Sequence, residues 1–298
     1  MMRQLLLALL LAGPARAASL NTGAAFLKLD PGARSAAMCG AYSAAAGSAD
    51  TLFFNPAGLA SLSRREFMAG HAEWLAGTRF DALAMGLPVA WGSLGVSALR
   101  LTAGTLEARS ANRQAAGSFE AQDAVYAVSA ARRFEGLAAG ASLKFLRSEI
   151  GPYSAQAVAV DLGVRRELPG RPISVGAAVR NLGKGLKFFD QEDPLPLMFT
   201  LGTTARLGSV LGVSLDLRHE PHDQRTSVAI GTEYAFLGTL ALRAGYGANA
   251  FARGSGQGPL SGLGAGVGFK MKSFGADYSF TPFGDLGDVQ RLSLSARF

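Results

Sequence analysis

Residues that could carry catalytic or metal chemistry are few and scattered in this chain of 298 residues. The three histidines are His71, His219 and His222, and the last two flank Glu220 and Pro221. A metal site needs three or four ligands in a fixed geometry; at a strand end the geometry of this pair is unset, and no third ligand is evident. The Gly-x-Ser-x-Gly motif of serine hydrolases is missing from the sequence. These residues therefore predict a protein that is not an enzyme and that uses no metal or other cofactor.

A glycine-rich segment at residues 262–268, Gly-Leu-Gly-Ala-Gly-Val-Gly, does not match a nucleotide-binding loop. Its glycines fall on every second residue, so on a strand they would all face the same side. Such a smooth face lets another backbone approach closely. Cys39 is the single cysteine, which excludes an intramolecular disulfide and a thiolate metal site. The segment predicts a packing surface rather than a phosphate site.

The dominant pattern of the chain is a two-residue alternation of apolar and polar side chains, clearest in residues 195–298. It is seen in Leu211-Gly-Val-Ser-Leu-Asp-Leu-Arg218 and again in Arg291-Leu-Ser-Leu-Ser-Ala-Arg-Phe298. Side chains alternate across a strand, so this period gives one apolar face and one polar face. Each run is about ten residues long, the length with which a tilted strand crosses a bilayer. The pattern is typical of a membrane β-barrel.

We therefore predict an all-β protein, a closed antiparallel transmembrane barrel of about fourteen strands, because such barrels have an even number. The predicted strands are residues 65–75, 78–90, 92–101, 121–134, 136–148, 154–167, 172–181, 195–207, 210–220, 225–237, 239–248, 260–271, 272–280 and 288–298. Tight turns and longer links alternate along the chain. The longer links are residues 102–120, 183–194 and 249–259.

Residues 82–99 carry no charged side chain and are long enough for a transmembrane helix. They contain several glycines and Pro88, however, and apolar residues alternate with small ones from Leu83 to Trp91. This alternation favours two strands that turn near Gly92 over a helix.

Charged residues stand singly on the polar faces of the predicted strands, although the formal net charge is +7. Nucleic-acid binding needs clustered basic residues, so this distribution argues against it. Charges on the polar face of a barrel strand point into the lumen. The candidate lumen-facing residues are Asp161, Arg206, Asp216, Arg218, Arg243 and Asp277.

The first 62 residues differ from the rest. Residues 1–17 read as a secretory signal peptide, with a basic start, a short apolar core and a small-x-small cleavage site. Residues 18–62 do not alternate; the alanine-rich stretch 33–46 predicts a short helix, and Asn55-Pro56 marks a turn. Irregular backbone at membrane depth is tolerated inside a barrel. We expect residues 18–62 to form a hatch in the lumen of a barrel made by residues 63–298.

Two segments of the N-terminal region, Gly32-Ala-Arg-Ser-Ala-Ala-Met-Cys-Gly-Ala-Tyr42 and Asn55-Pro-Ala-Gly-Leu59, resemble the motif of the PorV/PorQ family. These are outer-membrane barrels related to the FadL fatty-acid transporters. The resemblance implies a fourteen-stranded barrel with a hatch motif at Asn55, Pro56, Ala57 and Gly58. It also implies that Phe298 is the terminal aromatic residue read by the barrel-assembly machinery. Cys39 departs from the family, which usually has glycine at this position.

The resemblance further implies a location in the bacterial outer membrane, in contact with its lipid. The main expectation is a role in protein secretion or attachment, with secretion-system proteins or secreted cargo as partners. The alternative is a FadL-like passive channel for small hydrophobic molecules. Transport predicts an apolar pocket beside the hatch and a gap in the barrel wall near residues 194–196. Secretion predicts a partner surface on the barrel rim.

Overall fold

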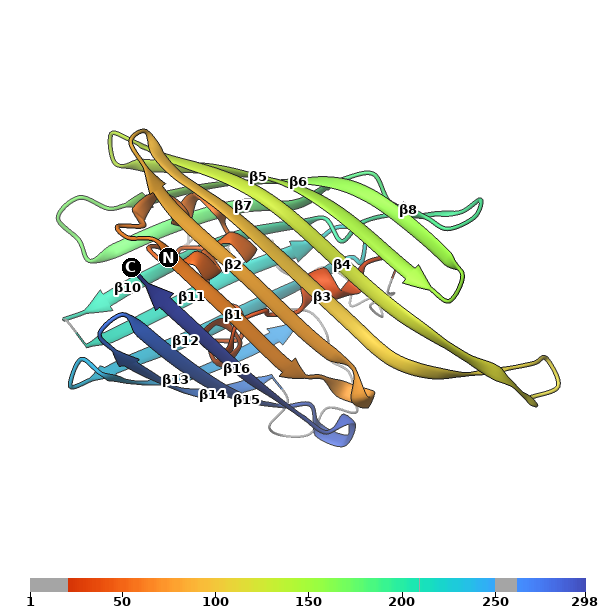
Figure 1. Ribbon diagram of the computed structural model, residues 1–298. Helices are drawn as coiled ribbons and strands as arrows, with labels where there is room; N and C mark the ends of the chain where they lie inside the picture. The colour runs from red at the N-terminus through yellow and green to blue at the C-terminus, as the bar shows by residue number, and fades with distance from the viewer. Residues whose placement is uncertain (1–20, 209, 250–261) are drawn as a thin grey trace, which may run out of the picture.

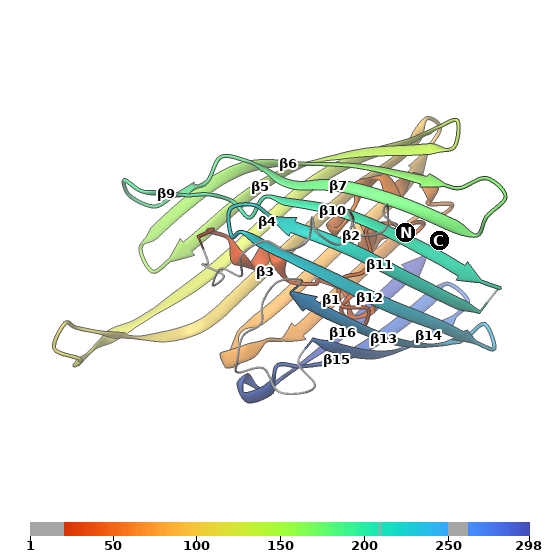
Figure 2. The same cartoon turned by 180° about the vertical axis from the view of Figure 1, so that it is seen from behind.

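The computed structural model describes residues 21–208, 210–249 and 262–298; the predicted signal peptide and most of the link 249–259 lie outside them. Within these residues, fourteen strands form one closed antiparallel barrel, and β8 and β9 form a separate two-stranded sheet (Figures 1 and 2). The first seven barrel strands are β1 (Glu66–Glu73), β2 (Arg79–Val89), β3 (Gly92–Arg109), β4 (Ala115–Phe134), β5 (Leu137–Ile150), β6 (Tyr153–Glu167) and β7 (Ile173–Gly183). After β8 (Leu186–Lys187) and β9 (Glu192–Asp193) come β10 (Met198–Leu207), β11 (Leu211–Glu220), β12 (Arg225–Phe236), β13 (Leu240–Asn249), β14 (Leu263–Met271), β15 (Phe274–Pro282) and β16 (Asp288–Arg297).

The barrel closes where the first strand, β1, pairs with the last, β16. Glu66 stands opposite Arg297 in this seam, and the Arg297 guanidinium Nε donates to Glu66 Oε2 at 2.7 Å. The other oxygen of Glu66 accepts a hydrogen bond from the hydroxyl of Ser48, which precedes the barrel in sequence, at 2.7 Å. The predicted fourteen-stranded antiparallel barrel is confirmed, and so is the hairpin that replaces a helix in residues 82–99.

One local prediction was wrong. Residues 102–120 are not a loop, because β3 and β4 continue through them as a projecting hairpin with a short turn at its tip. The short helix predicted in the alanine-rich stretch 33–46 is present as α2, which covers only Ala33–Ala37. The chain then takes a left-handed backbone conformation at Cys39 (φ 52°) and Gly40 (φ 75°), which ends the helix.

The two ends of the barrel differ. At the C-terminal end, where Phe298 lies, neighbouring strands are joined by tight turns such as those at residues 135–136 and 272–273. At the opposite end, which we call the hairpin end, the β3–β4 hairpin projects beyond the other strands, at the right of Figure 1. The longer link between β7 and β10, which carries β8 and β9, lies at this end too.

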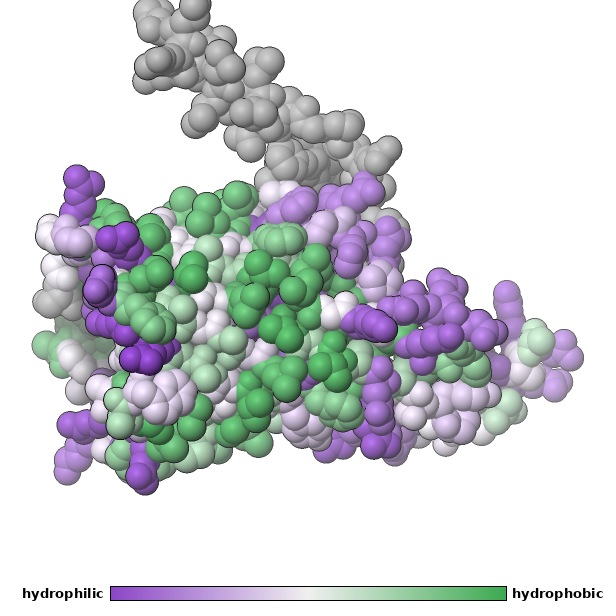
Figure 3. Space-filling view, turned by 90° about the horizontal axis from the view of Figure 1, so that it is seen from above, coloured by the Kyte–Doolittle hydropathy of each residue, from purple (hydrophilic) through white to green (hydrophobic). Residues whose placement is uncertain are grey.

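The outer wall is apolar around its middle and polar at both ends (Figure 3). In the described part of β10–β15, no outward-facing position carries Asp, Glu, Lys or Arg; Leu215, for example, is 46% exposed. On the other side of the barrel the apolar wall ends at a row of paired neighbours, His71, Asp81 and Arg100. His71 Nδ1 lies 2.7 Å from Asp81 Oδ1. An apolar belt between polar borders is the surface that a bilayer requires.

Residues 21–62 run through the lumen, and we call this stretch the hatch. It contains η1 (Ala25–Lys28), α2, η2 (Ala49–Phe53) and η3 (Pro56–Ser61). No helix in the described part of the chain is long and apolar enough to span a membrane. Two of the alternating glycines of residues 262–268 face the hatch: a Cβ on Gly264 would lie 2.7 Å from the Ala36 carbonyl oxygen, and one on Gly266 would lie 2.6 Å from Ala37 Cβ, while Gly262 and Gly268 face other strands. A Cβ on Gly245 of β13 would also meet the hatch, 2.6 Å from the Met38 carbonyl carbon. The predicted packing surface is thus present at Gly264 and Gly266.

Gly140 on β5 makes a similarly close approach and offers a test. A Cβ there would lie 2.5 Å from the Pro56 carbonyl carbon and 2.6 Å from the Ala57 nitrogen. We expect Gly140→Ala to lower the free energy of unfolding by about 1–3 kcal/mol, because backbone cannot move aside as a side chain can. Gly212→Ala is the matched control, since a Cβ there meets only the Glu233 carbonyl oxygen at 3.9 Å. Urea titration of both variants in bilayers, followed by gel mobility, checks this; equal stability would contradict it.

Candidate functional site

The candidate site is the lumen together with the hatch that fills it. The hatch starts at the hairpin end, where the Asn21 backbone amide donates to Asp223 Oδ1 at 3.0 Å and the Gly23 amide donates to the Pro194 carbonyl at 3.0 Å. Lys28 forms an ion pair with Asp223 and lies 3.5 Å from Glu220. The hatch ends at the opposite end, just before β1. It therefore crosses the whole height of the barrel.

The carboxylate of Asp223 anchors the beginning of the hatch. Burial raises its pKa, but the hydrogen bonds from Lys28, the Asn21 amide and Thr22 outweigh this and hold the pKa below its ordinary value of 3.8. Because the pKa of Asp223 is lower in the folded protein than in the unfolded chain, the anchor stabilises the folded state fully at pH values above 3.8. This stabilisation is lost as the pH falls through the pKa of the folded state. We expect hydrogen exchange of residues 21–29 to accelerate below about pH 3.8. Asp223→Asn should exchange fast already at neutral pH; a variant as protected as the parent at neutral pH would contradict this assignment.

Asn55 fixes the middle of the hatch to the wall. Its side chain is fully buried, and its amide Nδ2 donates to the Ser43 carbonyl at 2.7 Å and to the Val164 carbonyl at 3.1 Å. Its Oδ1 accepts from the Ala57 amide at 3.0 Å, which caps η3. A Cβ on Gly163 of β6 would lie 2.0 Å from this oxygen, so only glycine leaves room for the contact.

Asp216 holds the hatch from β11. One carboxylate oxygen accepts from the Tyr42 amide at 3.0 Å, the Ser43 amide at 2.8 Å and the Ser43 hydroxyl at 2.5 Å. Gly202, beside it on β10, leaves room for this carboxylate. Ser43 of the hatch is thus bound both by Asn55, within the hatch, and by Asp216 of the wall.

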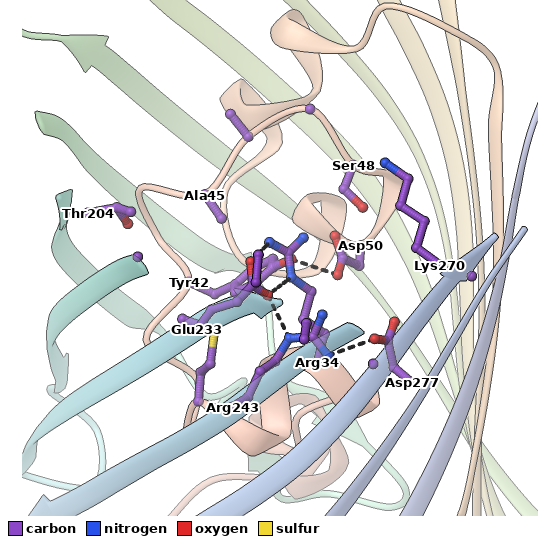
Figure 4. A pocket seen from close by; sticks show the side chains of 18 of the residues that line it. Arg34, Tyr42, Ala45, Ser48, Asp50, Thr204, Glu233, Arg243, Lys270 and Asp277 are labelled. Atoms are coloured by element: carbon purple, nitrogen blue, oxygen red, sulfur yellow. Dashed lines mark hydrogen bonds and ion pairs between the residues drawn. The ribbon is translucent and has the colours of Figure 1, made fainter. Parts of the chain in front are cut away.

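A cavity of about 770 Å³ opens at the C-terminal end of the lumen. A chain of ion pairs runs across it (Figure 4). Arg34 of α2 donates to Glu233 at 2.8 and 2.9 Å, Arg243 Nε donates to Glu233 at 2.5 Å, and Arg243 Nη1 donates to Asp277 at 2.7 Å. Arg206 also lines this cavity. Its walls suit water and charged solutes.

The hairpin-end half of the lumen contains an apolar region beside its charged groups. Inward-facing side chains of the wall there pack with Phe26 and Leu27 of the hatch in one buried cluster. The wall residues are Phe80, Leu99, Val125, Leu146 and Val289. A water-filled porin has a polar lumen. This apolar region and the charged cavity therefore favour different solutes.

A buried polar group interrupts the wall between β6 and β7. The register between these strands shifts after Val160, and Asn181 takes a left-handed conformation (φ 60°). The Asn181 amide donates to Asp161 Oδ1 at 2.7 Å, and Lys144 Nζ lies 2.5 Å from Asp161 Oδ2 and 2.8 Å from Asn181 Oδ1. These side chains take the place of regular strand pairing.

The wall is also irregular between β7 and β10. Their pairing starts at Arg180 opposite Met198, so the three residues before Met198 have no strand partner on β7. The Asn181 side-chain amide donates to the Pro196 carbonyl at 2.9 Å, and Pro194 accepts from Gly23 of the hatch. The transport hypothesis predicted a gap in the wall at residues 194–196. In the structure the side chain of Asn181 and the hatch close this part of the wall.

The comparisons with known proteins agree with this architecture. Residues 18–165 match the model of an uncharacterised protein family, UPF0164. No curated protein matches the sequence. Among solved structures, a FadL homologue of Pseudomonas aeruginosa is similar, with 12% identity and a TM-score of 0.63 over 90% of this chain and 98% of the other. A deltaS2S3 mutant of the monoaromatic hydrocarbon channel TodX has 15% identity and a TM-score of 0.62, over 89% of this chain and 97% of its own. At such identities the likeness shows the fold.

The structure brings some of the predicted site residues together and separates others. Asp216 binds the hatch, Arg243 and Asp277 form one ion pair, and Asp161 pairs with Lys144. Arg218 donates to the Gly40 carbonyl at 3.4 Å. All of these face inward. The terminal Phe298 is 63% exposed at the C-terminal end.

The three histidines form no site. His219 lies on the outer wall beside Thr226, His222 contacts the Leu195 carbonyl, and His71 pairs with Asp81. No group of three or more potential metal ligands occurs in the described ranges of the chain.

Sequence reasoning missed several charged residues of the lumen, among them Lys144, Arg180, Glu233 and Arg291. Glu233 and Arg243 stand directly opposite each other on β12 and β13. Counting back from the turn near Gly238 could have found this pair. Arg180 meets Leu27 of the hatch and Arg291 meets the ring of Trp74, both far away in sequence, and no local signal indicates such contacts.

Proposed function

We propose that this protein is a non-catalytic channel of the bacterial outer membrane that lets small hydrophobic compounds pass, with the hatch filling its lumen at rest. The observation that supports this proposal is the apolar region of the lumen, which includes Leu27 and Leu195, beside the irregular wall at residues 194–196. A hydrophobic solute would be stabilised there, at roughly 25 cal/mol for each Å² of apolar surface removed from water. It could then leave sideways into the membrane without crossing the charged cavity at the C-terminal end.

The apolar belt and the alternation of short and longer connections support a place in the outer membrane, with lipid around the belt. In this orientation the C-terminal end faces the periplasm and the hairpin end faces outward. The exposed Phe298 is then available to the barrel-assembly machinery. The secretion role implied by the resemblance has no structural observation in its favour, and it stays a prediction.

Movement of the hatch can be tested with a reversible crosslink. A Cβ on Gly23 would lie 3.2 Å from Cβ of Asp193 on β9, close to the roughly 3.5–4.5 Å of a disulfide. We would make Gly23→Cys with Asp193→Cys, and replace Cys39 by serine. The readout is the uptake of N-phenylnaphthylamine by intact cells, whose fluorescence rises when the probe enters lipid.

We expect cells that express the reduced protein to take up the probe faster than cells without it. Oxidation should remove this difference, and a reductant should restore it, because the crosslink ties the hatch to the β8–β9 sheet. The same protein in its reduced state is the matched control. Uptake no faster than in cells without the protein would refute the channel function.

A further inference from the structure

Three arginines from separate strands gather around one hatch carboxylate in the lumen. Arg180 lies on β7, Arg218 on β11 and Arg291 on β16, and all three act electrostatically on Asp30, between η1 and α2. Arg218 Nη2 and Asp30 Oδ1 both pack against Gly40, where a Cβ would lie 2.6 and 2.9 Å from them. Burial raises the pKa of Asp30, and the three positive charges act in the opposite direction.

The hydrogen-bonding capacity of these arginines is largely unused. Each guanidinium donates one long hydrogen bond to a neutral oxygen: Arg180 to Leu27 at 3.2 Å, Arg218 to Gly40 at 3.4 Å and Arg291 to Thr281 at 3.2 Å. The Nε atoms of all three are buried and have no hydrogen-bond partner among the described residues. No carboxylate in those ranges lies within 4.0 Å of any of the three guanidiniums. Arg180 and Arg291 are only 6% and 4% exposed.

Other acidic groups nearby are already engaged. Asp161 is paired with Lys144, Glu220 lies 3.5 Å from Lys28, and Asp216 accepts hydrogen bonds from Tyr42 and Ser43. Among the described residues, Asp30 is the carboxylate on which all three positive charges act. Buried guanidinium groups are costly to leave without an anion, and their planar N–H groups suit oxyanions.

We propose that Arg180, Arg218 and Arg291 form an oxyanion-binding site inside the lumen, where Asp30 of the hatch is the competing negative charge. The ligand is either a free inorganic oxyanion or the anionic head of an otherwise apolar molecule. The apolar cluster adjoins the site through Leu27, whose carbonyl accepts from Arg180 and whose side chain belongs to the cluster. The site extends the proposed function, and only the second ligand source rests on it.

Trp74 supplies a direct readout, because the Arg291 guanidinium lies 4.9 Å from the centre of its ring. The chain has two tryptophans, so a Trp91→Phe background leaves Trp74 alone. The purified protein in neutral detergent is titrated with sodium sulfate and, separately, with sodium benzoate at constant ionic strength. We expect a saturable change in fluorescence. Tighter binding of benzoate indicates a head group as ligand, and equal or tighter binding of sulfate indicates a free oxyanion.

Variants decide whether the arginines are responsible. Arg218→Gln should weaken binding about tenfold or more, and Asp30→Asn should strengthen it by a similar factor, because a charge-assisted contact is lost or a competing charge removed. If Arg218→Gln does not fold, Arg218→Lys takes its place in the test. It keeps the charge and should bind the anion with intermediate strength. Arg100→Gln, on the outer wall, should bind as the parent does. No saturable change in parent and Asp30→Asn, or equal affinity in all variants, would overturn the site. Because uptake plays no part in this assay, its failure leaves the channel proposal standing.

Discussion

Asn55→Asp will detach the hatch from the wall and make the barrel leaky to ions. The aspartate has the same shape, but it loses the amide donor and turns a carboxylate oxygen toward the carbonyls of Ser43 and Val164. The site is fully buried, so the charge cannot reach water. A buried group that loses its partners costs about 1–3 kcal/mol, and more when it is charged. Asn55 also binds three segments at once, so one substitution weakens the hatch, β6 and β7 together.

Conductance in planar bilayers measures this effect, because an emptied barrel of this size holds a column of water. We expect larger and longer openings from Asn55→Asp than from the parent protein. Hydrogen exchange should also rise across residues 43–61. Asn112→Asp, the same substitution in the exposed turn of the β3–β4 hairpin, is the control and should behave as the parent does. Unchanged conductance and exchange in Asn55→Asp would show that the hatch is held by other contacts.

Leu215→Arg will lower the stability of the folded barrel in a bilayer by roughly 2–4 kcal/mol. Leu215 lies in the middle of β11, points outward and is 46% exposed. An arginine there would place its charge in the hydrocarbon layer near the midplane. Urea titration of the protein in lipid vesicles gives the free energy of unfolding.

Two further variants separate the effect of the charge from the effects of side-chain size and of position in the barrel. Leu215→Ala removes the same side chain without adding charge and should cost much less. Thr204→Arg places the new charge on the inner face of the neighbouring strand, where it lines the cavity of about 770 Å³ and can extend into water. If Thr204→Arg and Leu215→Arg were equally destabilising, the assignment of inner and outer faces would be wrong.

The barrel could be predicted from sequence because its strands separate lipid from lumen. Alternation such as that of Leu215 and Leu217 against Ser214 and Asp216 follows directly from this boundary. The same rule fails in residues 102–120, because the projecting hairpin leaves the barrel and both of its faces meet water. Its strands carry no alternation that would distinguish them from a loop.

The interior of the lumen was less accessible to sequence reasoning. The two-residue alternation of β11 indicates that Asp216 and Arg218 point inward. It does not indicate their partners, Ser43 and Gly40, which lie more than 170 residues earlier in the chain. The apolar inner wall was missed for a related reason. Val125 and Leu146 face the lumen and are apolar because they contact the hatch rather than water. The hatch itself has no periodic pattern, since each of its residues meets a different strand.

Glu66 has a consequence for biogenesis. Its two oxygens accept hydrogen bonds from Ser48 and from Arg297. One carboxylate therefore contacts both the hatch and the last strand, β16, and both contacts form only when the hatch is in place and the barrel is closed. Its side chain is 2% exposed, so an incomplete intermediate in which either donor is missing would strand a shielded negative charge. Closure of the barrel is thereby tied to correct placement of the hatch.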